Sequence, residues 1–214
     1  MIFCEIVEIL VSVAGPCDDL PPPATEEELL HTEKILGHRL PTGLREIYKI
    51  HNGERDFERS LENGKSLLGV FYDYPFLSLS ALIREYEGWG AVRRDVDVPG
   101  MPYEPPRRSH PPRYIRPLYS SPGWVTFAGG SAAIGIDFAP DSEGVEGQII
   151  TFGRDDVTLF QLAPDFDTFL RQVLEDCRRR RRNTGFRPAG WTSLYDELIQ
   201  GQAGRSTQVS DLGV

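Results

Sequence analysis

The segment from Trp124 to Asp156, WVTFAGGSAAIGIDFAPDSEGVEGQIITFGRDD, is the most strand-like part of the chain and decides its fold. Within it, Ile134 and Ile136 alternate with Gly135 and Asp137, which is the period of two expected for a strand with one packed face. Turn-forming residues separate the apolar runs and bring the chain back on itself. We therefore predict an antiparallel meander in which one face is packed and the other carries the polar group.

An amphipathic helix is predicted directly after the meander. Asp165 can cap its start, and apolar residues then recur at steps of three and four positions. These residues are Phe166, Phe169, Leu170, Val173, Leu174 and Cys177. We expect this stripe to be buried in the core.

Helices are also predicted ahead of the sheet. Thr25 and Glu28 have the spacing of a capping box, and Gly37 with Pro41 would end the helix that begins there. The predicted apolar side of this helix consists of Leu29, Leu30, Glu33, Ile35 and Leu36. A second helix, from Thr42 to about His51, would form a hairpin with the first. The opening stretch of the chain is predicted as a further buried helix.

The middle of the chain is less regular. Residues 66–71 are predicted as a short strand, and residues 79–86 as a short helix that Ser78 or Ser80 would cap. Residues 99–122 hold eight prolines in 24 positions, which removes too many backbone donors for regular structure. We expect an irregular surface loop there. Its arginines would be either a locally basic contact or, as base rates favour, a solvated surface.

Length and composition indicate one folded domain. The chain has 214 residues, of which 40% are apolar and 26% charged, as in ordinary globular proteins. We predict a single domain over residues 1–182, with a proline-rich insertion at about 99–122. Residues 183–214 are predicted to form a partly disordered extension.

Charge and cysteine usage narrow the possible partners. The net charge is −9 even though five arginines stand together at 178–182, which argues against direct binding of nucleic acid. Three scattered cysteines favour a reducing compartment, and no apolar run is long enough to cross a membrane. We therefore expect a cytoplasmic protein without membrane contact.

Motifs for phosphate binding, serine hydrolysis and zinc are missing from the sequence, so we expect no cofactor and no metal. The acidic residues Asp137, Asp155 and Asp156, with Arg154 beside them, leave two interpretations open. Paired carboxylates could divide acid and base roles or hold a divalent cation. A local hydrogen-bond network that fixes the turn is the favoured interpretation, because no nucleophile or general base completes the set.

Four phrases, taken in order, resemble the SUKH superfamily, whose founding members are fungal Smi/Knr-type regulators of cell-wall synthesis. They cover Leu20 to Glu54, Phe76 to Trp89, Trp124 to Asp156 and Leu162 to Leu170. The most specific parts are His51-Asn52-Gly53, the strand from Ile134 to Asp137, the pair Gly147-Gln148, and Gly153-Arg154-Asp155.

The resemblance implies an α+β fold, with a bent, largely antiparallel sheet flanked by helices. It also implies a protein-binding function without catalysis. Many bacterial members of the family are immunity proteins that block a toxin, often a nuclease or a deaminase, and fungal members connect cell-wall synthesis to signalling. We give first place to an immunity-type protein that neutralises a toxin, and second place to a regulatory scaffold. A carboxylate-based hydrolase is the third hypothesis.

An acidic surface suits the immunity hypothesis, because a toxin that handles nucleic acid has a basic groove. The residues expected at the partner surface are Asp137, Glu143, Glu146, Arg154, Asp155 and Asp156. Six others are expected to shape the backbone rather than to contact a partner: His51, Asn52, Gly53, Gly135, Gln148 and Gly153.

Overall fold

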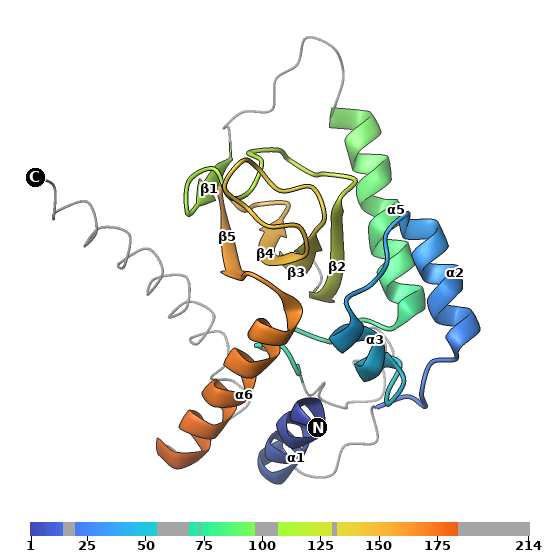
Figure 1. The fold of residues 1–214 in the computed structure, drawn as a ribbon, viewed down its shortest axis with the longest axis vertical. Helices are drawn as coiled ribbons and strands as arrows, with labels where there is room; N and C mark the ends of the chain where they lie inside the picture. Colours follow the sequence, from blue (N-terminus) through green and yellow to red (C-terminus); the bar gives the residue numbers. More distant parts are fainter. Residues whose placement is uncertain (15–19, 55–68, 73, 97–106, 130–131, 184–214) are drawn as a thin grey trace, which may run out of the picture.

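The computed structural model describes residues 1–14, 20–54, 69–72, 74–96, 107–129 and 132–183. They form an α+β arrangement in which helices surround one mixed sheet (Figure 1). The helices are α1 (Ile2–Ala14), α2 (Glu26–Leu36), α3 (Thr42–Tyr48), α5 (Leu79–Val96) and α6 (Phe166–Asn183). The strands are β1 (Arg108–His110), β2 (Trp124–Gly129), β3 (Ala132–Asp137), β4 (Gln148–Gly153) and β5 (Thr158–Ala163).

The sheet has the strand order β1-β5-β4-β3-β2. Strands β2 to β5 pair antiparallel with their neighbours in the sequence, which confirms the predicted meander. The short strand β1 was not predicted, and it pairs parallel to β5 at the sheet edge. At the opposite edge, the amide of Leu77 donates to the carbonyl of Phe127 at 2.9 Å, so that part of β2 is covered as well.

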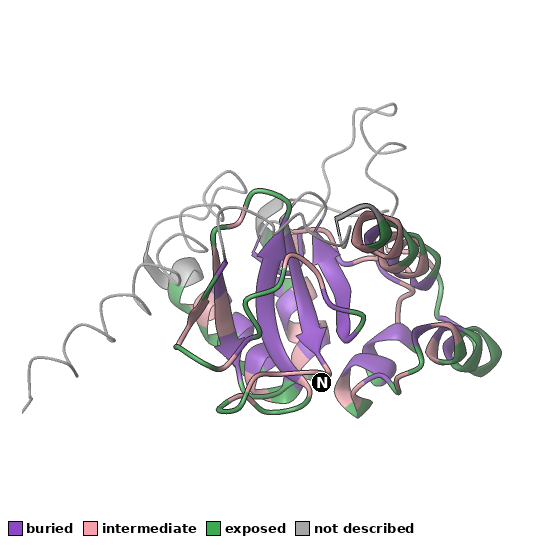
Figure 2. Cartoon of the chain, turned by 90° about the horizontal axis from the view of Figure 1, so that it is seen from above, coloured by how far each residue is buried: buried purple, intermediate pink, exposed green. Residues whose placement is uncertain are grey.

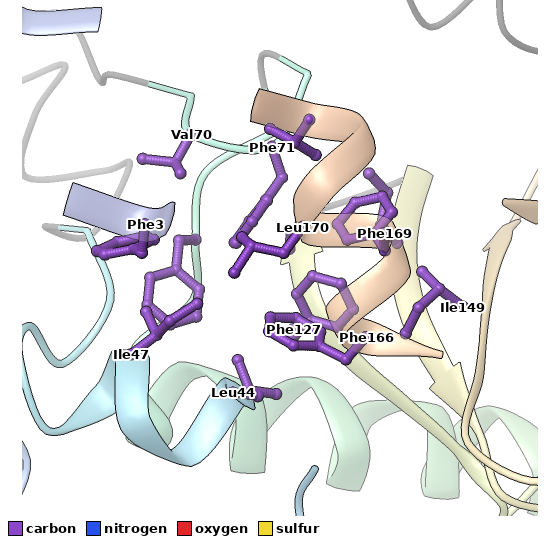
Figure 3. Packing of buried hydrophobic residues seen from close by; sticks show 14 of the residues in the cluster. Phe3, Leu44, Ile47, Val70, Phe71, Phe127, Ile149, Phe166, Phe169 and Leu170 are labelled. Atoms are coloured by element: carbon purple, nitrogen blue, oxygen red, sulfur yellow. The ribbon is translucent and has the colours of Figure 1, made fainter. Parts of the chain in front are cut away.

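One face of the sheet packs on the main core. The apolar stripe of α6 lies in this core with all six predicted residues buried. Helices α1 and α3 add side chains such as Phe3, Leu44 and Ile47 to the same core (Figure 3). Aromatic rings meet edge to face in this core: the Phe71 and Phe127 centroids are 5.4 Å apart at 89°, and Phe127 and Phe166 are 5.4 Å apart at 80°. This geometry is favourable beyond the area that the rings bury.

The other face of the sheet is also buried, which corrects the expectation of a polar outer face. A second cluster covers it, made of Trp89, Ile115, Trp124, Ala133, Ile150, Phe152 and Leu159. Trp89 comes from α5 and Ile115 from the proline-rich region, so both elements lie over this face. Strands β2 and β4 are therefore buried at every residue (Figure 2).

Local sequence signals fix the helix ends. Thr25 and Glu28 form the predicted capping box, and Gly37 ends α2 at a φ of 70°. At α6, the Asp165 carboxylate accepts from the Thr168 amide at 2.7 Å, as predicted. Ser78 rather than Ser80 caps α5, because its hydroxyl accepts from the Ala81 amide at 3.3 Å.

Several boundaries differ from the prediction. α3 ends at Tyr48 instead of about His51, and α5 continues to Val96, well beyond Tyr86. Leu30 is 55% exposed, because α2 turns Leu29, Thr32 and Leu36 inward instead. Of the predicted strand at 66–71, residues 66–68 lie outside the described residues, and residues 69–71 form no strand beyond an isolated bridge at Phe71. Of the predicted extension at 183–214, Asn183 is described and ends α6, and the rest lies outside the described residues.

Of the predicted loop at 99–122, residues 99–106 lie outside the described residues. Residues 107–122, which we call the strap, are not a solvated loop. Arg107 is 3% exposed and Ile115 is fully buried, while β1 adds strand pairing inside the segment. The strap can contain several prolines because it lies at a sheet edge and across one face of the sheet, where few of its backbone N–H groups have to donate hydrogen bonds.

Adjacent leucines on α2 test the burial pattern. Leu29 is fully buried and Leu30 is 55% exposed. Leu29→Ala should lower the free energy of unfolding by about 2–5 kcal/mol, because it leaves a cavity. Leu30→Ala should change it by no more than about 0.5 kcal/mol, because the side chain remains in water. Urea denaturation measures both, and equal losses would contradict the orientation of α2.

Candidate partner-binding surface

The tripeptide His51-Asn52-Gly53 forms a structural corner. His51 Nδ1 lies 3.0 Å from the carbonyl oxygen of Pro21, and Asn52 Oδ1 accepts from the first amide of α5, that of Leu79, at 2.9 Å. Gly53 has a φ of 78°, and a Cβ there would lie 2.3 Å from the backbone nitrogen of Ser78. The corner thus joins the end of the helical hairpin to the start of α5.

Glu54, the next residue, has a structural role that the sequence did not reveal. Its side chain is buried, and its carboxylate accepts from the backbone amides of Gly69 at 2.9 Å, Val70 at 3.0 Å and Phe76 at 2.8 Å. Buried amides need acceptors, and a carboxylate that accepts several of them is strongly held. The local sequence gives no sign of this role because the donors come from 15 to 22 residues further along the chain.

Gly135 is required by close packing in the sheet. A Cβ on this residue would lie 2.6 Å from the ring of Phe152 and 2.7 Å from the carbonyl oxygen of Val125. Gly153 lies at the end of β4 and pairs with Ala132 of β3. The close packing at Gly135 agrees with a backbone-shaping role, while that role stays a prediction for Gly153.

Asp137 and Gln148 form a buried polar network at one end of the sheet. Both residues are fully buried. The Gln148 amide nitrogen donates to Asp137 Oδ2 and to the carbonyl of Tyr114, each at 2.9 Å, and Asp137 Oδ1 accepts from the Ala139 amide at 2.9 Å. Burial raises the pKa of the Asp137 carboxyl above its ordinary value, and the hydrogen bonds from Gln148 and Ala139 offset part of that rise.

Asp137 is therefore not a surface contact, which corrects its place among the expected partner residues. Its side chain has no exposed area, and both carboxylate oxygens accept from the chain itself. The network instead links β3 and β4 to the strap through Tyr114. Burying polar groups costs little free energy only when each of them has a hydrogen-bond partner, as in this network.

The remaining predicted contacts fall at opposite ends of the sheet. Glu143 and Glu146 lie in the β3–β4 loop, whereas Arg154, Asp155 and Asp156 lie in the β4–β5 turn. The six residues of β4 separate the two groups, a span of roughly 17 Å at the usual rise per residue. The predicted set is therefore two surfaces rather than one.

The side chains at these two ends differ in exposure. Glu143, Glu146, Arg154 and Asp155 are exposed, while Asp156 is partly buried. Burial raises the pKa of the Asp156 carboxyl, and the nearby Arg107 guanidinium counteracts the rise.

The strap connects the two ends. At the β4–β5 turn, the Arg107 guanidinium donates to the carbonyl of Arg154 at 3.0 Å and stacks 4.4 Å from the ring centroid of Tyr119. At the β3–β4 loop, Arg113 Nε donates to Ser142 Oγ and Arg116 Nε donates to the carbonyl of Pro140, each at 3.1 Å. The exposed surface at both ends is thus a composite of loop and strap.

This arrangement does not assemble the carboxylate site that a hydrolase would use. Asp137 lies at the end of β3 next to the start of β4, whereas Asp155 and Asp156 follow the other end of β4. Paired carboxylates must lie close together to divide acid and base roles or to share a cation. Within the described ranges, no group of three or more His, Cys, Asp or Glu side chains is placed to hold a metal ion.

Comparison with known proteins identifies the family. Residues 23–172 match the SMI1 / KNR4 family (SUKH-1). The chain belongs to this family. The match begins ahead of α2 and ends within α6, so it includes the whole sheet and the strap.

Curated relatives are fungal. The chain is 27% identical over 181 residues to the cell wall assembly regulator SMI1 of Saccharomyces cerevisiae, which covers 72% of this chain and 35% of the relative. It is 26% identical over 189 residues to the glucan synthesis regulatory protein of Neurospora crassa, with 74% of this chain and 34% of the relative covered.

A third relative is the cell wall biosynthesis/cell cycle regulator smi1 of Schizosaccharomyces pombe, 29% identical over 161 residues, with 72% of this chain and 31% of the relative covered. The alignments thus cover about a third of the length of these relatives. The names describe regulators rather than enzymes.

None of the helices in the described part of the chain has the length and apolarity needed to cross a membrane.

Two glycines with left-handed backbone test the corner at Gly53. Gly37 has a φ of 70° with no atom within 4 Å of an added Cβ, whereas a Cβ on Gly53 meets backbone at 2.3 Å. Gly37→Ala should lower the free energy of unfolding by about 1–2 kcal/mol, the cost of the left-handed conformation alone. Gly53→Ala should lower it by about 3 kcal/mol or more, because Ser78 must also move.

Thermal or urea denaturation of the two alanine variants measures this difference. A Gly53→Ala variant no less stable than the Gly37→Ala variant would mean that the corner does not hold the start of α5 against residues 51–53.

Proposed function

We propose that this chain is a protein-binding module without catalytic activity, and that it acts in the regulation of cell-wall synthesis. The observation that carries the proposal is the placement of its polar residues. Asp137, Gln148 and Glu54 are buried and bonded to the chain itself, while the loops at the two ends of the sheet, like the outer sides of the helices, carry exposed charged side chains. Loops held by a rigid scaffold are typical sites of macromolecular contact.

The regulatory part of the proposal is supported by the fungal relatives, whose names refer to cell wall assembly and glucan synthesis. Since the chain covers only about a third of those relatives, the shared unit would be the binding module of larger regulators. In this view the chain recruits a component of the wall-synthesis machinery or of its signalling, and another protein performs the chemistry.

Charge variants at the two ends of the sheet test the proposal. The tagged wild-type chain would be used to capture partners from the native organism, in parallel with Glu143→Lys/Glu146→Lys and with Arg154→Glu/Asp155→Lys. A matched control, Glu27→Lys/Glu87→Lys, changes exposed residues on α2 and α5. We expect a defined protein to be captured by the wild type and the control, and its capture to change roughly 10-fold in at least one end variant.

A wall phenotype completes this test. Loss of the gene should make cells more sensitive to wall-digesting enzymes. The wild type and the control should restore resistance in the deletion strain, whereas an end variant that no longer captures the partner should not. Capture of no protein above background, together with normal wall resistance in the deletion strain, would contradict the proposal.

An immunity role is the second candidate, favoured by the acidic balance of the chain. The net charge is −9, and Glu143, Glu146 and Asp155 are exposed. Such a surface would be steered toward the basic groove of a nuclease or deaminase toxin. This candidate requires that the captured partner be toxic on its own and that co-expression of this chain restore growth. Failure to restore growth would remove it.

A further inference from the structure

The strap has a charge opposite to that of the chain as a whole. Residues 107–122 contain the four arginines Arg107, Arg108, Arg113 and Arg116 and no acidic residue, within a chain of net charge −9. A local reversal of charge on an acidic protein creates a patch that attracts anions while the rest of the surface repels them. The strap is therefore a place on this molecule where an acidic ligand is favoured.

The four arginines divide into two roles. Arg107 is 3% exposed, stacks on Tyr119 and donates to the β4–β5 turn, so it serves the fold. Arg108, Arg113 and Arg116 are exposed. The basic surface of the strap is thus formed by these three side chains.

Arg113 and Arg116 are held in place before any partner arrives. Each uses Nε to bond the β3–β4 loop at 3.1 Å, one on Ser142 Oγ and the other on the carbonyl of Pro140. Because Nε is the atom that bonds the loop, the terminal amino groups of Arg116 remain at the outer end of its guanidinium fork, while Arg113 shares one of its own with Glu143. A carboxylate can bind there with two parallel hydrogen bonds. Side chains that are already ordered lose less conformational entropy on binding.

The strap backbone under these arginines is fixed as well. The amide of Arg108 donates to the carbonyl of Val157 at 2.9 Å, and the amide of Ile115 donates to Ser109 Oγ at 2.9 Å. Ile115 itself is fully buried in the second cluster. The arginines therefore project from a rigid segment.

One acidic side chain already lies against this surface. Glu143 lies 3.3 Å from Arg113, and the two side chains are 52% and 68% exposed. An ion pair this exposed contributes little stability, so an incoming carboxylate can replace it at small cost. Glu143 then acts as a competitor for Arg113 in the unbound protein.

We propose that the strap binds an acidic segment of a partner protein, with its carboxylates on Arg113 and Arg116. This inference rests on the proposed protein-binding function and names the chemistry of one of its surfaces. Leu118, two residues beyond Arg116, is 42% exposed and adds an apolar contact. A nucleic acid fits less well, because Glu143 and Glu146 on the neighbouring loop would repel a continuous phosphate backbone, whereas a peptide can space its carboxylates.

The direct test uses a short labelled peptide of alternating Glu and Ser, with fluorescence anisotropy on the full chain at low salt. Arg113→Gln/Arg116→Gln should weaken binding roughly 10-fold. The control, Arg94→Gln/Arg171→Gln, removes the same charge from exposed arginines on α5 and α6 and should leave affinity nearly unchanged. Binding to the wild type should also fall steeply as salt is added.

A second variant keeps the test informative if the double substitution disturbs folding. Glu143→Gln removes the competing carboxylate while leaving the strap intact, so it should tighten peptide binding roughly 2- to 5-fold. Unchanged or weaker binding by this well-folded variant would count against the assignment.

Other outcomes overturn the proposal outright. They are no measurable binding of the peptide, an equal loss in the control, equal binding of a matched Lys and Ser peptide, and tighter binding of a thymidine oligonucleotide of the same charge. Self-association that Arg113→Gln/Arg116→Gln abolishes would assign the surface to a second copy of this chain instead.

The peptide assay also separates this inference from the wider function. A partner captured by the wild type and equally by Arg113→Gln/Arg116→Gln would refute the strap as the binding surface and leave the protein-binding function in place. Capture of no partner would refute the function, whatever the peptide assay gives.

Discussion

Burial of both faces of the sheet is the constraint on which the rest of the structure depends. The main core covers one face through α1, α3 and α6, and the second cluster covers the other beneath α5 and the strap. Ile134 and Ile136 belong to the first core, while Ala133 between them belongs to the second. The proposed partner would therefore contact the sheet ends, the strap or the outer helices rather than either face of the sheet.

Polar residues inside the fold make this double burial possible. Gln148 bonds Asp137 and the carbonyl of Tyr114, which fastens the strap where β3 and β4 meet. Arg107 fastens the strap at the opposite end by donating to the carbonyl of Arg154. With both ends fixed, Ile115 stays packed over the second cluster. Asp137, a candidate catalytic carboxylate in the sequence, is thus used to close the fold, which agrees with relatives named as regulators.

Features set by local spacing could be predicted from the sequence. The meander, the α6 stripe, the Thr25 capping box and the Asp165 cap each depend on residues within a few positions of one another. Features set by distant contacts could not. The three donors to Glu54 come from residues 69–76, and the burial of Asp137 depends on a strap about twenty residues upstream. The sequence analysis also assigned Glu143 and Asp155 to one partner surface, because the pattern alone does not show that the whole of β4 separates them.

The central claim is that the strap is a fixed part of the fold rather than a solvated loop, and native-state amide hydrogen exchange tests it most directly. The amides of Arg108 and Ile115 are bonded to Val157 and Ser109. If the strap closes the second face, these amides should be protected by at least about 100-fold over an unstructured peptide, which corresponds to an opening free energy of about 3 kcal/mol. Exchange of both amides at the rate of an unstructured peptide, while β3 and β4 remain protected, would contradict the account.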